Sequence, residues 1–217
     1  LLCAGLVWSL YSWRTRRLND MIDLRTADIL KLGEVGRALT STLDPEQVFA
    51  RMYGQVRRRL DTGVFLIGIY DESSEQIHFV YRIENARRQE ASVMSMHETD
   101  RPAVWCIREQ RELVVANSKQ LLEYVGTVLP PSEGAATETI VYFPLMLEQR
   151  VLGCLSVQSL QADAYDQNKL EFLRVMASYT AIALSNTTAH GDLARAHRHL
   201  KETQSQLIQS EKMASLG

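Results

Sequence analysis

Among the side chains that could do chemistry, the three cysteines, Cys3, Cys106 and Cys154, are the strongest nucleophiles. They are odd in number, lie far apart and form no Cys-x-x-Cys pair, so the sequence indicates neither a disulfide framework nor a zinc site, and we predict no metal. Cys154 lies in the middle of an expected strand, where a small core residue is favoured over a reactive thiol. The cysteine pattern is typical of a reducing compartment.

Five histidines are the next candidates. His190, His197 and His199 lie in a polar helical stretch near the C-terminus, whereas His78 falls in an alternating, strand-like run and His97 shortly after it. We interpret them as exposed or helix-interface groups rather than as ligands or phosphate acceptors.

Motifs of the common enzyme classes are absent from the sequence. It has no Gly-x-Ser-x-Gly, no Walker loop, no His-Glu-x-x-His and no carboxylate pair at helical spacing in an apolar stretch, so we predict no catalytic residues. The 24 basic and 26 acidic side chains form no basic stripe, which argues against nucleic-acid binding. With 217 residues, 46% of them hydrophobic, the chain can form one globular domain with appendages.

Residues 1–13 carry no charge and end in an aromatic cluster that includes Trp13. As a helix this stretch would be roughly 20 Å long, shorter than the ~30 Å of membrane hydrocarbon, so we expect it to be the end of a longer transmembrane helix. Arg14, Arg16 and Arg17 follow at once, which by the positive-inside rule places the residues after Trp13 in the cytoplasm, at the inner membrane. The alternative is a buried or interfacial helix of a soluble protein.

Helical seams are expected on both sides of the central domain. In residues 14–40 apolar residues follow steps of three and four, which predicts a signalling helix. In residues 190–217 Leu193, Leu200 and Leu207 recur every seven residues, which predicts a coiled-coil exit helix and a parallel homodimer. The alternative is a solvated terminal helix that merely dimerises. The companion core positions are weak, so a small free energy could switch the packing: they are Ala196, Thr203 and Ser210 in one register, or His197, Gln204 and Glu211 in the other.

Between these helices, residues 41–189 are predicted to form an α+β domain. Asp44 can cap a helix that begins at Pro45, and Asp166 can cap the last long helix. Apolar residues between them alternate with period two, so we expect an antiparallel sheet of five or six strands with helices packed on one face. The expected strands are 64–71, 76–84, 91–97, 113–116, 139–147 and 150–159, with short helices within 101–110 and 120–125.

Three segments resemble parts of the GAF domain family: the hairpin at 143–159, the final helix at 172–186 and the entry at 33–44. The resemblance covers about residues 30–189 and implies the GAF fold. It implies no particular ligand, because GAF domains bind cyclic nucleotides, tetrapyrroles, haem, small metabolites or nothing.

Motifs of the ligand-binding sub-types do not match. No Asp-Glu pair lies beyond Asn168 and Lys169, as cyclic-nucleotide members require, and neither Cys106 nor Cys154 precedes a histidine, as bilin attachment requires. Two well-separated cysteines also do not make the redox cluster of the methionine-sulfoxide-reducing members. We therefore predict no cofactor.

The resemblance places any small-molecule pocket between the sheet and the irregular segment, on the open face of the domain. Four aromatic residues are then the candidates for ligand binding, although ordinary core positions are an equally good interpretation for them. These candidates are Tyr81, Trp105, Tyr124 and Phe143.

The run from Gln209 to Gly217 is similar to the approach to the phosphoacceptor helix of sensor histidine kinases, whose histidine would fall just beyond Gly217. This resemblance implies an ATP-dependent kinase core downstream and a response regulator as partners, with the GAF domain as sensory relay. Two alternatives are open: the same module could control a diguanylate cyclase or another output domain, or it could be a ligand-free dimerising spacer.

Overall fold

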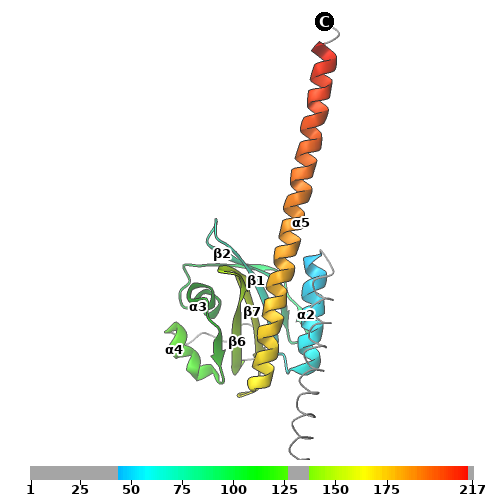
Figure 1. Cartoon of the computed structure of the whole chain (residues 1–217). Coiled ribbons are helices and arrows are strands. Elements are labelled where there is room, and N and C mark those ends of the chain that lie inside the picture. Colours follow the sequence, from blue (N-terminus) through cyan, green and yellow to red (C-terminus); the bar gives the residue numbers. More distant parts are fainter. Residues whose placement is uncertain (1–43, 127–136, 215–217) are drawn as a thin grey trace, which may run out of the picture. The chain divides into compact units, whose positions relative to one another are not determined.

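The computed structural model describes residues 44–126 and 137–214. The expected transmembrane end at 1–13 and signalling helix at 14–40 lie outside the described residues. Within them the chain forms a central sheet with long helices on one face and short helices on the other (Figure 1). The predicted α+β class is thereby confirmed.

The sheet is antiparallel throughout and has seven strands in the order β3-β2-β1-β7-β6-β5, with β4 also paired to β2. All six expected strands are present, and the seventh is a two-residue strand that is too short to leave a period in the sequence. The strands are β1 (Val64–Asp71), β2 (Gln76–Glu84), β3 (Arg87–Arg88), β4 (Ser92–Ser95), β5 (Leu113–Val115), β6 (Thr139–Leu147) and β7 (Arg150–Ser159).

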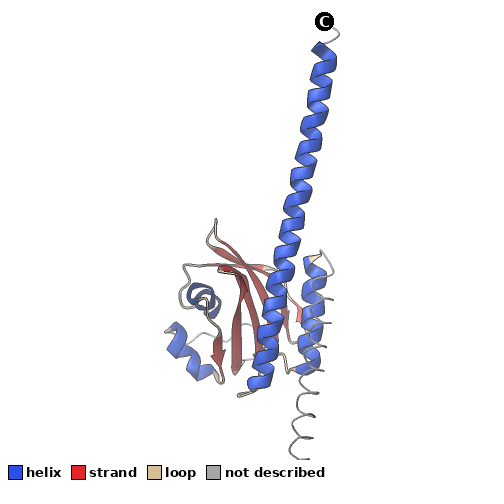
Figure 2. Ribbon diagram, in the orientation of Figure 1, coloured by secondary structure: helices blue, strands red, loops and turns tan. Residues whose placement is uncertain are grey.

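Two long helices, α2 (Pro45–Arg59) and α5 (Gln167–Ala214), cover one face of the sheet, as expected. The short helices expected within 101–110 and 120–125 are present as α3 (Pro102–Glu109) and α4 (Leu121–Val125), and they cover the other face of the sheet (Figure 2). A single 3-10 turn, η1 (Ser118–Gln120), precedes α4. The sheet is therefore enclosed on both sides over much of its area.

The N-terminal cap of α2 forms as its sequence predicts. Asp44 accepts a hydrogen bond from the backbone N–H of Glu46 at 3.0 Å, and Pro45 occupies the first helical position. Gln47 donates its side-chain amide to the Asp44 carboxylate at 3.0 Å. The cap fixes where α2 begins, and with it which side chains α2 presents to the sheet.

The core on the long-helix face is built from α2, α5 and the sheet. Phe49 and Met52 of α2, Phe65 of β1, and Leu173 and Met176 of α5 are almost inaccessible to solvent. Burial of such side chains stabilises a fold by about 1.5–3 kcal/mol each before entropy is subtracted. This packing joins α5 to the rest of the domain.

A bulge in β2 changes which face its side chains point to. Ile67 of β1 pairs with Tyr81, but the next residue, Gly68, pairs with Phe79, so Val80 is an extra residue in β2. Phe79 consequently packs in the cluster under α3. Tyr81, two residues later, contacts Phe49 of α2 on the opposite face.

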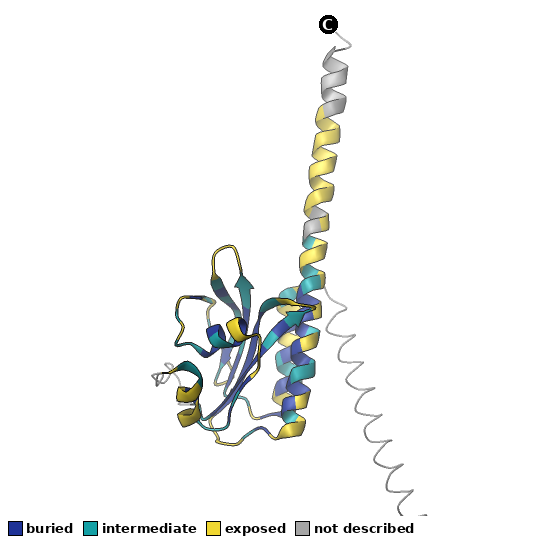
Figure 3. Cartoon of the chain, turned by 60° about the vertical axis from the view of Figure 1, so that its left-hand side comes forward, coloured by how far each residue is buried: buried dark blue, intermediate teal, exposed yellow. Residues whose placement is uncertain are grey.

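Helix α5 is a single element of 48 residues, about 72 Å long at 1.5 Å per residue. Its first part is buried along one side up to Leu184, and the described side chains beyond Gly191 are exposed (Figure 3). It crosses residue 190, the expected start of the exit helix, without a break. None of the described helices combines the length and the hydropathy needed to cross a membrane.

Candidate functional site

Trp105 of α3 and Tyr124 of α4 lie against each other on the short-helix face. Their ring centroids are 5.1 Å apart and the rings are almost perpendicular, at 89°, which is a favourable aromatic geometry. Both side chains are half-buried and pack on the core beneath α3. The structure therefore brings together two of the four candidate residues at the edge of a packed apolar cluster.

Tyr81 and Phe143 lie elsewhere. The Tyr81 ring contacts Phe65 at a centroid distance of 6.0 Å, and the Arg88 guanidinium lies 3.7 Å above it. Burial raises the pKa of Tyr81 above its usual value. Phe143 alternates along β6 with Tyr142, a member of the cluster under α3, so Phe143 faces the long helices. Both residues belong to the long-helix core, away from Trp105.

A buried polar group on the short-helix face was missed in the sequence. Gln158 donates to Tyr142 Oη at 3.5 Å and to Ser156 Oγ at 3.2 Å, and Thr137 donates to Gln158 Oε1 at 2.9 Å. Ser156 and Gln158 are two residues apart in otherwise apolar β7, a spacing that could have revealed them. Because the network connects neutral groups, it adds no charge to this face.

Two thiols lie in the same cluster, Cys106 on α3 and Cys154 on β7. Burial raises the pKa of Cys154 to about 12, and burial together with the nearby Cys154 raises that of Cys106 still further. Burial likewise raises the pKa of Tyr142. All three groups are neutral at physiological pH, so neither thiol is prepared to act as a nucleophile.

A bidentate ion pair links the short-helix side to α5. Arg174 Nε lies 2.7 Å from Glu112 Oε2, and its terminal nitrogen donates to Glu112 Oε1 at 2.8 Å. Glu112 precedes β5 and follows α3 closely in the chain. The Arg174 hydrogen bond is the main reason that the pKa of Glu112 lies below its usual value. The pair thereby links the segment between α3 and β5 to α5 at the surface.

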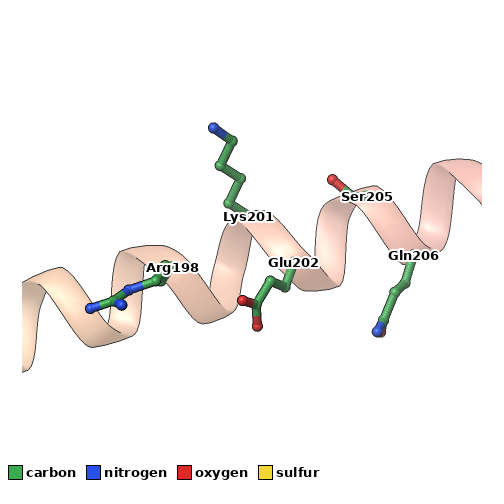
Figure 4. A pocket seen from close by; sticks show the side chains of 5 residues that line it. All are labelled: Arg198, Lys201, Glu202, Ser205 and Gln206. Atoms are coloured by element: carbon green, nitrogen blue, oxygen red, sulfur yellow. The ribbon is translucent and has the colours of Figure 1, made fainter.

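A shallow hollow on the distal half of α5 is not an enclosed site. Its side chains all come from one helix and are exposed, and they point to different sides of it (Figure 4). A small molecule there would remain largely in water. No group of three metal-ligating side chains occurs among residues 44–126 and 137–214. The residues around the hollow are Arg198, Lys201, Glu202, Ser205 and Gln206.

Comparison with known proteins gives the family. A family model described as GAF domain matches residues 42–185. The GAF domain of a phosphoenolpyruvate-protein phosphotransferase from Acinetobacter is similar in structure, with 15% identity, TM-score 0.62, and 75% of this chain and 95% of that chain covered. Residues 122 to 287 of a methyl-accepting chemotaxis protein match with 11% identity and TM-score 0.61, covering 71% and 97%.

A free methionine-R-sulfoxide reductase from Neisseria meningitidis also matches, with 11% identity, TM-score 0.57 and coverage of 73% and 89%. At these identities the likeness concerns the fold alone. The search among curated proteins gave no match. Since the family model spans most of the described domain, the chain belongs to the GAF domain family, a family of signalling and sensory modules.

Proposed function

We propose that this chain is the sensory and relay module of a two-component sensor histidine kinase. In this proposal residues 1–13 hold it at the inner membrane, the GAF domain lies in the cytoplasm, and two copies act together. The observation that carries the proposal is α5: one unbroken helix begins at Gln167, packs in the domain core from Leu170, and runs to Ala214, within the kinase-like run at 209–217.

Packing of the first part of α5 supports a relay. Thr180 is fully buried; its hydroxyl donates to the Met176 carbonyl oxygen at 2.8 Å and lies 3.4 Å from the sulfur of Met52 on α2. Leu173 and Met176 are buried in the core. Close-packed interiors transmit displacement because they are not compressible. A shift of the domain therefore moves the start of α5, and the helix carries the movement to its far end.

A ligand on the short-helix face would reach α5 through Glu112. We propose a small neutral molecule beside Trp105 and Tyr124, close enough to displace α3. The α3–β5 segment would then pull on Arg174 through the bidentate pair. A ligand changes the output only if it binds one packing of the helices better than the other.

The test joins the full chain to a histidine kinase core directly after Gly217 and inserts one to seven residues after Ser205. Each inserted residue turns the downstream helix by about 100°. Autophosphorylation should vary with the phase of the insertion and return when seven residues restore the heptad. The same insertions in the exposed turn at 72–74 are the control and should change little. Equal activity for every insertion after Ser205 would contradict the proposal.

A further inference from the structure

The part of α5 that lies in the domain has a side that is only partly covered. On its buried side Leu173, Met176 and Thr180 contact the core. On the other side Ile182 is 38% exposed, and Val175 and Tyr179 are half-buried. Apolar side chains on a solvent-facing helix surface indicate a partner surface when they continue a regular pattern.

That pattern is the heptad of the exit helix. Leu193 and Leu200, which are 66% and 64% exposed, occupy the first core position, a, of the heptad. Counting back in sevens gives Asn186 and then Tyr179. The second core position, d, falls on Val175, Ile182, Ala189, Ala196 and Thr203. The exposed face of the domain and the seam of the exit helix thus share one continuous register.

The upstream end of this seam is defined as well. The next a position before Tyr179 is Phe172, which is buried in the domain. The guanidinium of Arg59 lies 4.6 Å above its ring, so Phe172 is not available to a second chain. The shared register therefore begins at Val175.

We propose that two copies of this chain pair through a parallel, in-register coiled coil that begins at Val175, inside the domain, and that Asn186 sets its register. The proposal rests on the homodimeric relay proposed above and adds its extent and its register residue. The surface of α5 in the domain is then an interface between copies.

The exit helix alone has a weak coiled-coil core, which argues that the coiled coil extends into the domain. Beyond Ala189 its d positions are Ala196, Thr203 and Ser210, which contribute little apolar area. Coiled coils become stable only over about three to four heptads with apolar core positions. Ile182 supplies the larger apolar side chain that the d positions of the exit helix lack, and Tyr179 adds a further apolar a position.

Asn186 indicates that the helix packed against this face of α5 belongs to a second copy of the chain. It is exposed in the described chain, and its amide both donates and accepts hydrogen bonds. At an a position of a parallel pair it faces the same residue of the other copy, and the two amides satisfy each other. A single Asn at an a position is known to fix register and two-stranded pairing, because slipped registers leave it buried without a partner. An unrelated helix would need a matching amide at the same level.

The test adds one cysteine at a time to the full chain in detergent, in a Cys3→Ser background that keeps the buried Cys106 and Cys154. Ile182→Cys, Ala189→Cys and Leu200→Cys lie at core positions, where a parallel pair brings the two Cβ atoms within disulfide reach. Lys201→Cys and Ser205→Cys lie on the outer side of the same helix and are the controls. Mild oxidation should link all three core variants, about tenfold faster than the controls.

The outcomes separate the two proposals. Linking at Ala189 and Leu200 but not at Ile182 would overturn the extension into the domain and leave a dimer of exit helices. No linking at any core position would overturn the homodimer itself. Linking at a single level alone would indicate an antiparallel pair and overturn the proposed register.

Asn186→Leu tests the register directly. Chains with Ile182→Cys are mixed with chains with Ala189→Cys, which become linked when the helices slip by one heptad. With Asn186 present these mixed products should be rare, and Asn186→Leu should increase them about tenfold. Ser205→Leu, on the outer side, should not. An unchanged yield with Asn186→Leu would overturn the role of Asn186.

Discussion

Arg174 on α5 and Glu112 between α3 and β5 form a bidentate ion pair, with nitrogen–oxygen distances of 2.7 and 2.8 Å. This pair joins the two sides of the domain at its surface: α5 packs on the long-helix face, and α3 on the other. The planar guanidinium fixes the orientation of the carboxylate as well as its distance. The start of α5 and the end of the α3 segment are therefore held in one geometry.

The first prediction concerns the pH dependence of this pair. The hydrogen bond from Arg174 lowers the pKa of Glu112 below its usual value. The pair therefore stabilises the fold above that usual pKa, and its contribution is lost as pH falls through the lowered pKa. Since about a third of each side chain is exposed, Glu112→Gln should cost only about 1 kcal/mol at pH 7. Urea unfolding of both proteins at pH 7 and at descending acidic pH measures the difference. A difference in unfolding free energy between the two proteins that stays constant through the acidic range would contradict this prediction.

The second prediction concerns the thiols. Because burial holds Cys106 and Cys154 in the neutral form, neither should react with a thiol reagent at pH 8 while the domain is folded. The measurement is a colorimetric thiol titration of the Cys3→Ser variant, before and after denaturation. Two thiols should react in denaturant and essentially none without it. Rapid reaction of either one in the native protein would show that the cluster under α3 is open.

The third prediction compares two glycines. Gly153 in β7 has φ +154°, and a Cβ there would overlap the carbonyl oxygen of Gly68 on β1, so Gly153→Ala should cost about 3 kcal/mol or more through backbone displacement. Gly54 lies within α2 with open space around it. Gly54→Ala is therefore the matched control and should raise the free energy of unfolding by up to about 1 kcal/mol, because Ala favours the helix over Gly. Chemical denaturation of both variants measures their free energies of unfolding. Equal effects would mean that β1 and β7 are not as close as the structure places them.

The sequence predicted the strands well because their side chains alternate with period two, and the start of α2 because Asp44 and Pro45 are a complete capping signal. It did not predict the bulge at Val80, since one extra residue leaves the local pattern intact but reverses the face beyond it. Tyr81 was therefore placed with Trp105 although the sheet lies between them. Contacts such as that of Trp105 with Tyr124 depend on how two short helices pack, which no local period encodes.

The fourth prediction concerns ligand binding at the Trp105–Tyr124 pair. A small molecule that binds the folded domain raises its melting temperature, because at a concentration of 100 Kd it stabilises the fold by about 2.7 kcal/mol. Thermal unfolding across a panel of metabolites and nucleotides should identify such a compound, and Trp105→Leu or Tyr124→Leu should abolish its shift.

Phe143→Leu is the matched control for this experiment, because Phe143 is 2% exposed in the long-helix core. It should lower the melting temperature of the protein without ligand and leave the ligand-induced shift in place. If Phe143→Leu removes the shift and Trp105→Leu does not, the ligand binds on the other side of the sheet. If no compound shifts the melting temperature, the domain acts as a dimerising spacer, and α5 transmits only what reaches it through the chain.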